Sequence, residues 1–178
     1  MKNILAFTGS NSSTSINKQL LDFTIGHIKG FEVNTIDLRD YKMPIYSSDL
    51  ENESGIPASV KELSNILQSF DYLIVATNEH NWTISAFFKN ILDWLSRNDS
   101  KFMQDKSIFV LSTSPGRGGA NSANDYLHTM LPKFGGKVTS HFALKSFYHS
   151  FSEEKGIYDE KQNTTFHEAL NLFLKSIS

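Results

Sequence analysis

The chain has 178 residues, a length typical of one domain, and 39% of them are hydrophobic, as in a globular protein rather than a disordered one. Seventeen basic and 19 acidic residues leave a formal net charge of −2, so we expect no nucleic-acid partner. The sequence contains no cysteine, which excludes disulfide frameworks, thiol redox chemistry and thiolate-held metals. Any redox activity therefore requires a bound cofactor.

The first apolar run covers residues 4–7 and ends at Thr8 and Gly9. It is too short for the core of a signal peptide and far too short for a membrane span. We therefore expect a cytoplasmic protein that makes no contact with a membrane.

Short apolar runs alternate along the chain with longer segments of helical periodicity, which is typical of a parallel sheet built from βαβ units. The expected strands are residues 3–8, 32–37, 72–77, 107–112 and 137–144. The first, third and fourth are almost continuously hydrophobic, so they should be central strands covered on both faces. This pattern predicts one α/β domain, residues 1–178, with a flavodoxin-like fold. Its doubly wound five-stranded parallel sheet has the order 2-1-3-4-5 and helices on both faces.

Apolar residues at spacings of three and four predict the helices. The first carries Ile16, Leu20 and Phe23 on one face, and the second begins after Pro57. The fourth is expected over residues 121–134, and the last carries apolar residues from 166 to 177. Two longer stretches, about residues 38–56 and 146–160, exceed the usual length of a connection and are candidate functional loops.

The third helix, residues 85–96, is apolar on two adjacent stripes. These stripes are Phe87/Ile91/Trp94 and Phe88/Leu92/Leu95. One face of a sheet needs only one such stripe. The surplus predicts a partner subunit, in a homodimer or a homotetramer.

The loops at the carboxyl ends of the strands are the expected ligand site, at the point where the strand order reverses. After the first strand, residues 10–15 are six consecutive hydroxyl or amide residues that lead into a helix. Such a turn suits a phosphate, because free backbone amides and the helix dipole both favour an anion. The alternative is a helix cap with more such residues than it needs. The candidate residues are Ser10, Ser12, Ser15, Ile16 and Asn17.

The loop after the third strand combines polar and aromatic side chains, which suits a planar ligand. Its candidate residues are Asn78, Glu79, His80, Asn81 and Trp82. A general-base pair formed by Glu79 and His80 is disfavoured, because adjacent side chains diverge in most backbone conformations.

The loop after the fourth strand is rich in glycine, which lets backbone amides approach a flat ligand closely. Its candidate residues are Ser112, Ser114, Pro115, Gly116, Arg117, Gly118 and Gly119. It is not a dinucleotide fingerprint, because Asn121 occupies the third glycine position and the loop does not follow the first strand. The alternative is an ordinary glycine-rich turn in which Arg117 is a surface charge. The histidines show no spacing typical of metal ligands, and we predict neither a metal site nor a catalytic side chain.

Together, these loops resemble the NADPH-dependent FMN reductase family of flavodoxin-like proteins, which also includes chromate, quinone and azo-dye reductases. The similar segments are residues 9–17, 43–50, 79–81, 88–97, 112–119 and 151–156. The resemblance implies an FMN-dependent NAD(P)H oxidoreductase. It would pass hydride from NADPH or NADH through FMN to a small acceptor such as a flavin or a quinone.

The resemblance also implies roles for individual residues. Ser10, Ser15 and Asn17 would hold the FMN phosphate, residues 79–81 would border the isoalloxazine ring, and Ser114 with residues 116–119 would face its pyrimidine side. Ser12 stands where the family commonly has an arginine, and Trp82 where it commonly has a glycine.

Two other functions are compatible with the same fold. One is a flavodoxin-like electron carrier, although such carriers usually present a strongly acidic face that a net charge of −2 does not supply. The other is a flavin-free interaction domain. Uptake of FMN by the purified protein would distinguish an enzyme from a flavin-free interaction domain.

Overall fold

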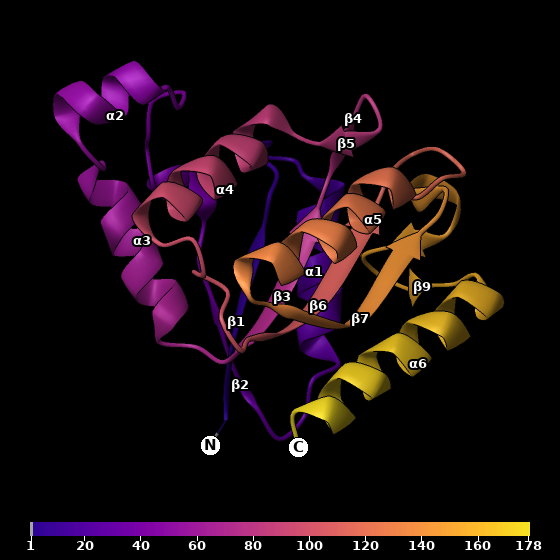
Figure 1. Cartoon of the computed structure of the whole chain (residues 1–178). Helices are drawn as coiled ribbons and strands as arrows, with labels where there is room; N and C mark the ends of the chain where they lie inside the picture. Colours follow the sequence, from indigo (N-terminus) through magenta and orange to yellow (C-terminus); the bar gives the residue numbers. More distant parts are fainter. Residues whose placement is uncertain (1) are drawn as a thin grey trace.

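The computed structural model describes residues 2–178 and has an open parallel sheet at its centre (Figure 1). The strands of this sheet pair in the order β2-β1-β3-β6-β7, and every pair is parallel. The strands are β1 (Asn3–Thr8), β2 (Glu32–Thr35), β3 (Tyr72–Thr77), β6 (Ser107–Thr113) and β7 (Lys137–Leu144). Because β6 and β7 are the fourth and fifth strands of this sheet, the predicted order 2-1-3-4-5 is confirmed.

Helices cover both faces of the sheet, as predicted (Figure 1). One face carries α1 (Ile16–Gly26) and α6 (Glu160–Ser176), and the other carries α3 (Ala58–Gln68), α4 (Ala86–Asn98) and α5 (Asn121–Met130).

The apolar sequence of β1 explains this two-sided arrangement. Successive side chains of a strand point to opposite faces. Ile4 and Ala6 accordingly pack with the residues of α1 and α6, while Leu5 and Phe7 pack with those of α3, α4 and α5. All four side chains are buried, which is why the run is hydrophobic without alternation.

The two long connections contain local structure that periodicity did not reveal. The first holds a 3-10 turn, η1 (Leu38–Asp40), and the short helix α2 (Ser48–Ser54), and the second holds η3 (Phe147–His149) and the hairpin β8 (Phe151–Ser152) with β9 (Gly156–Ile157). Another hairpin, β4 (Glu79–His80) with β5 (Thr83–Ile84), follows β3. These elements are short, so they lack the length that makes a period detectable.

The fourth predicted helix is divided in the structure. The α-helix α5 ends at Met130 and continues as a 3-10 helix, η2 (Leu131–Phe134). Pro132 lies in this second part and has no backbone N–H, so it cannot extend the α-helical ladder.

The stripe Phe87/Ile91/Trp94 of α4 is covered largely by the chain itself. Trp94 is completely buried, and its indole N–H donates to the carbonyl of Pro44 at 2.8 Å. The ring of Tyr46 meets that indole edge-on at a centroid distance of 5.1 Å, and Asn90 accepts from the amide of Tyr46 at 2.8 Å. The width of this helix face is therefore no argument for a partner subunit. Within this stripe, Ile91 is also buried and Phe87 remains half-buried.

Within residues 2–178, none of the helices combines the length and the apolar character that a membrane span requires.

Candidate functional site

The loops after β1, β3 and β6 meet around one cavity of about 360 Å³ at the carboxyl edge of the sheet. This volume lies within the range of about 300–1,000 Å³ that is usual for small-molecule sites. The position is the one expected from the fold, since β2 and β3 flank β1 on opposite sides and the strand order reverses there. The lining residues are Ser10, Asn11, Ser12, Thr14, Ser15, Ile16, Asn17, Asn78, Glu79, His80, Thr113, Ser114, Pro115 and Tyr148.

Gly9 starts the first loop and lets α4 pack closely against it. Its amide donates to the carbonyl of Ala76 at 2.8 Å, and its own carbonyl accepts from the hydroxyl of Ser85 at 3.0 Å. A Cβ atom at this position would overlap the ring of Phe88. The glycine is therefore required by a close contact between the loop and the helix.

The hydroxyl groups of the first loop accept hydrogen bonds from nearby backbone amides and so hold the backbone of the loop in place. The Ser10 hydroxyl accepts from the amide of Ser12 at 3.2 Å, and the Ser12 hydroxyl accepts from the amide of Thr14 at 3.3 Å. Ser15 caps α1, because its hydroxyl accepts from the amide of Lys18 at 3.3 Å. The alternative interpretation, that these residues only cap the helix, therefore explains Ser15 but not the rest of residues 10–15.

The same loop has the donor set that a phosphate group needs. The first backbone amides of a helix have no partner within the helix, so the start of α1 at Ile16 and Asn17 offers N–H groups and a positive dipole end. Hydroxyls from four lining residues add neutral donors. The lining contains no lysine or arginine, and Lys18 is instead paired with Asp22 on the exposed side of α1. A phosphate here would be held by neutral groups and the helix end.

Asn17 lines the cavity, but its side chain is already engaged. Both ends of its amide bond to the backbone of Thr113, and Asn17 is 2% exposed. The side chain of Asn17 therefore connects α1 to the end of β6, and the contact with a phosphate that the resemblance implies for Asn17 would fall to its backbone amide.

The hairpin after β3 is held in place by Glu79. Its carboxylate accepts from the amide of Ala123, in the first turn of α5, at 3.0 Å. The residue that precedes this helix is Ala120, which has no side chain able to cap it. Glu79 therefore caps α5 from another element, where the helix dipole favours a negative charge.

Two candidate residues of this hairpin do not line the cavity. Asn81 and Trp82 form its turn, and the Trp82 side chain is 79% exposed. The indole therefore leaves the cavity open. Asn78, in contrast, lines the cavity, and its Oδ1 atom is buried without a hydrogen-bond partner within residues 2–178. A buried acceptor of this kind is normally paired, so it fits a ligand that brings an N–H group, as the isoalloxazine ring of FMN does.

The third loop contributes fewer lining residues than its glycines predict. Ser114 and Pro115 line the cavity, whereas Gly116, Arg117, Gly118 and Gly119 do not. Gly119 has a φ of 61°, and a Cβ atom there would lie 2.8 Å from the carbonyl oxygen of Leu144. Glycine is therefore needed at position 119 for the positive φ of the turn and for the close packing of the turn on the end of β7.

Ser112 lies behind the loop rather than beside the ligand site. It is completely buried; its hydroxyl donates to the carbonyl of Gly119 at 2.9 Å and accepts from the side-chain amide of Asn124 at 3.0 Å. The strand runs one residue further than expected, to Thr113, so Ser112 is still part of the sheet and Thr113 reaches the cavity.

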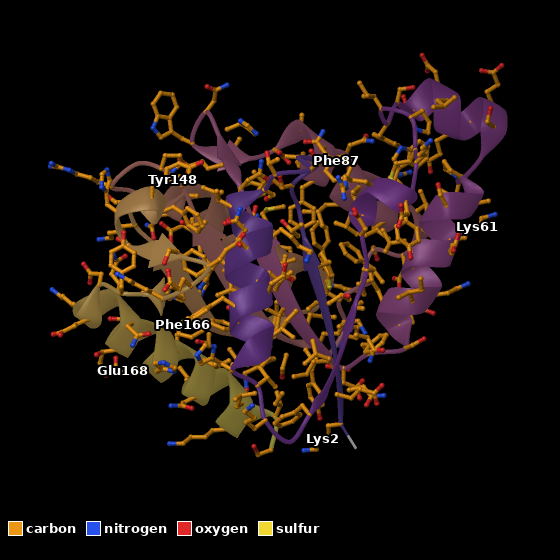
Figure 2. The ribbon with its side chains drawn as sticks, turned by 180° about the vertical axis from the view of Figure 1, so that it is seen from behind. Lys2, Lys61, Phe87, Tyr148, Phe166 and Glu168 are labelled. Atoms are coloured by element: carbon orange, nitrogen blue, oxygen red, sulfur yellow. The ribbon has the colours of Figure 1, made fainter. Side chains whose placement is uncertain are left out.

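Sequence reasoning missed four lining residues: Asn11, Thr14, Thr113 and Tyr148. Asn11 and Thr14 belong to the polar stretch of residues 10–15, but Tyr148 comes from a different segment. It is brought to the cavity because the amides of Ser146 and Phe147 donate to the carbonyls of Gly116 and Ser114, at 2.9 and 3.0 Å. Figure 2 shows Tyr148 near the edge of the sheet opposite to Lys2. The only signal in the sequence was the unusual length of that connection.

Comparisons with known proteins agree with this geometry. The sequence profile of NADPH-dependent FMN reductase matches residues 2–149. A subunit of NADH:(hydroxy)cinnamate reductase from Vibrio ruber is 28% identical over 177 residues, which cover 97% of this chain and 85% of that protein. An NAD(P)H-dependent FMN reductase from Pseudomonas aeruginosa is 30% identical over 129 residues, which cover 72% of this chain and 68% of that protein.

Solved structures confirm the fold. The flavoenzyme FerB of Paracoccus denitrificans, an NAD(P)H:(acceptor) oxidoreductase, superposes with a TM-score of 0.80 over 98% of this chain and 96% of that one, at 23% identity. This likeness establishes the flavodoxin-like architecture. The family match over most of the sequence confirms the enzyme class and the FMN cofactor that the resemblance implied. The chain belongs to the NADPH-dependent FMN reductase family.

Proposed function

We propose that this protein, acting as one FMN-binding domain, passes hydride from NADH or NADPH through FMN to a small acceptor such as a flavin or a quinone. One observation carries this proposal: three polar loops, separated in the sequence, line a single cavity at the edge where the strand order reverses. Bound FMN supplies the redox chemistry, since its ring accepts hydride from the nicotinamide and gives the electrons to an acceptor.

The phosphate end of the cofactor is assigned to the start of α1. There the hydroxyls of Ser10 and Ser15 accept hydrogen bonds that close two turns of the backbone. These turns fix the positions of the Ser12 and Thr14 hydroxyls and of the first amides of the helix. A phosphate gains both hydrogen bonds and the favourable end of the helix dipole at this position. The contact is made without a positively charged side chain, so we expect it to vary only weakly with salt concentration.

The ring of the cofactor is assigned to the space between Asn78 and residues 113–115. Asn78 lines the cavity and its buried Oδ1 atom, which has no partner among residues 2–178, would accept from a ring N–H. Ser114 and Pro115 line the same cavity. His80 and Tyr148 lie at the same cavity. We assign no proton transfer to Glu79, because its carboxylate accepts from an amide in the first turn of α5.

The partners proposed are a nicotinamide dinucleotide, a small electron acceptor and a second copy of the chain, in a homodimer or homotetramer. The 86% exposed Ile45, a large apolar side chain on the surface, supports an association between copies. We also propose that the protein works in the cytoplasm, where nicotinamide dinucleotides are kept reduced.

Titration of the purified protein with FMN tests the proposed function. We expect one FMN per chain by visible absorbance, followed by bleaching of the flavin band when NADH or NADPH is added without oxygen. Riboflavin, which lacks the phosphate, is the matched ligand and should bind at least about tenfold more weakly, a difference of about 1.4 kcal/mol. Protein that stays colourless with FMN, or that binds riboflavin equally well, contradicts the proposal.

A further inference from the structure

Tyr148 is a large aromatic side chain at the candidate cofactor cavity. It lines the cavity and is 65% exposed. Within residues 2–178 it is the one phenylalanine, tyrosine or tryptophan of the lining, which otherwise consists mainly of serine, threonine and asparagine. A tyrosine ring is flat and apolar, with a hydroxyl at its tip. Tyr148 is therefore the large flat apolar group that this lining offers to a ligand.

The turn that carries Tyr148 is hydrogen-bonded to the loop after β6. The amide of Ser146 donates to the carbonyl of Gly116 at 2.9 Å, and the amide of Phe147 donates to the carbonyl of Ser114 at 3.0 Å. Ser114 itself lines the cavity. Because Tyr148 directly follows Phe147, its backbone is fixed one residue away from a contact with this lining residue.

Further contacts hold the same turn from within the chain. Phe147 is 3% exposed, and its ring stacks on the ring of Phe151 at a centroid distance of 4.9 Å. The ring of Tyr148 lies roughly perpendicular to that of Phe147 at 5.5 Å, and the carbonyl of Tyr148 accepts from the hydroxyl of Tyr158 at 3.3 Å. A side chain that is presented from a fixed turn loses little entropy when a ligand covers it.

These contacts associate Tyr148 with one end of the cofactor. The phosphate is assigned to the start of α1, with the hydroxyls of Ser12 and Thr14, whereas Ser114 belongs to the part assigned to the isoalloxazine ring. The turn of Tyr148 is bonded to Ser114. Aromatic rings favour offset-stacked or edge-to-face contacts with other flat rings, so the ring end of FMN suits this side chain.

We propose that Tyr148 is a cofactor-binding residue that contacts the isoalloxazine ring of FMN through its own aromatic ring. The connection after β7 then supplies a fourth segment of the cofactor site, besides the loops after β1, β3 and β6. The hydroxyl of Tyr148 has no part in this contact, and the phosphate is held without it. This inference rests on the proposed function, because it requires FMN in this cavity.

Titration of the oxidised protein with FMN and with riboflavin tests the contact. The variants are Tyr148→Ala, Tyr148→Leu, which keeps an apolar side chain, and Tyr148→Phe, which keeps the aromatic ring. We expect the Ala and Leu variants to raise the dissociation constants of both flavins by the same factor, at least about fivefold, and the Phe variant to raise them less than about twofold. Riboflavin is the matched ligand because it has the ring and lacks the phosphate.

The fluorescence of bound FMN gives a second readout that needs no turnover. A phenol in contact with an excited flavin donates an electron to it and quenches its emission, whereas a phenylalanine ring is too difficult to oxidise to do so. Bound FMN should therefore be brighter in Tyr148→Phe than in the wild type, although the affinity is retained. Equal emission from the two proteins would show that the phenol does not touch the flavin ring, and would overturn the inference.

His149→Ala is the control for a change in the turn itself. His149 is the next residue of η3, is exposed and does not line the cavity, so its replacement should leave both dissociation constants and the fluorescence unchanged. Without FMN, Tyr148→Ala should unfold at nearly the same temperature as the wild type, because its side chain is mostly exposed. A large fall in that temperature would show that the ring supports the turn instead, and would overturn the inference.

The remaining outcomes separate this inference from the proposed function. If Tyr148→Phe weakens the binding of FMN but not of riboflavin, the hydroxyl binds the phosphate and the assignment to the ring is wrong. If Tyr148→Ala binds both flavins as the wild type does, the inference is wrong and the proposed function stands. If the wild type takes up no FMN, the proposed function fails first, and the inference fails with it.

Discussion

The side-chain amide of Asn17 is paired with the backbone of Thr113 through two hydrogen bonds. Its Oδ1 atom accepts from the amide of Thr113 at 2.8 Å, and its Nδ2 atom donates to the carbonyl of Thr113 at 3.1 Å. The two residues are 96 positions apart in the sequence, and both are buried. The pair ties the start of α1 to the end of β6, and both residues line the candidate cofactor cavity.

Replacing Asn17 should therefore affect both stability and the cavity. In Asn17→Ala, the buried amide and carbonyl of Thr113 lose their partners, and we expect a loss of about 2–3 kcal/mol in the free energy of unfolding. FMN should bind more weakly, because the two loops are no longer held at a fixed spacing. Urea unfolding and FMN titration measure the two effects.

Lys18→Ala is the matched control for Asn17→Ala. It removes only the exposed pair with Asp22 in the next position of the same helix, so it should change stability by less than about 0.5 kcal/mol. An Asn17→Ala protein as stable as this control would show that the two hydrogen bonds contribute little.

The role of Glu79 as a cap can be separated from a role in proton transfer. Glu79→Ala removes the acceptor for the amide of Ala123, and we expect a loss of about 1 kcal/mol in stability. Glu79→Gln keeps an oxygen acceptor and should lose roughly half of that, the part due to charge and helix dipole.

Kinetics of Glu79→Gln complete this test. If Glu79 only caps α5, the rate of NAD(P)H oxidation with FMN bound should change less than about threefold. General acid–base catalysis contributes about 10²–10⁴-fold to a reaction rate, so its loss would be much larger. A loss of a hundredfold with normal stability would assign a proton-transfer role to the carboxylate.

The contact between Gly9 and Phe88 predicts a steric effect at the start of the first loop. In Gly9→Ala the new methyl group overlaps the buried ring, and we expect a loss of about 1–3 kcal/mol from overpacking. Phe88→Leu in the same chain should recover part of it, which a double-mutant cycle measures. Gly26→Ala has open space around its Cβ position and should leave stability equal or slightly higher. Equal losses in the two alanine variants would argue against the steric explanation.

The ion pair of Glu51 predicts a pH-dependent contribution to stability. The guanidinium of Arg97, which donates to Glu51 at 2.9 Å, and the hydroxyl of Tyr46 lower the pKa of this carboxyl. A lowered pKa in the folded state means that the carboxylate stabilises the fold above its unfolded-state pKa, and that this contribution is lost as the pH falls through the folded value.

Glu51→Gln should therefore lower the unfolding temperature near pH 7 and have no effect at strongly acidic pH, where Glu51 of the wild type is protonated as well. Thermal unfolding of both proteins at several pH values measures this convergence. Glu53→Gln changes an exposed carboxyl on the same helix and is the control. A difference for Glu51→Gln that persists unchanged in acid would contradict the explanation.

Much of the fold could be predicted because its determinants are local. The runs that form β1, β3 and β6 are continuously apolar, and this property alone indicates strands with helices on both faces. The carboxyl ends of parallel strands share one edge, so the three polar loops were expected to meet. Elements of two to seven residues, such as β4 and α2, escaped prediction because a short segment has no measurable period.

Composition and periodicity by themselves determined the sheet, its order and the edge that carries the site, since these follow from which residues avoid water and at what spacing. Only the tertiary structure decided which side chains of the loops reach the cavity. The side chain of Asn17 bonds to the backbone of Thr113, Tyr148 reaches the cavity from the connection after β7, and the carbonyl of Pro44 accepts from the indole of Trp94. The partners in each of these contacts lie far apart in the sequence, and buried polar groups pair with whatever the fold brings near them.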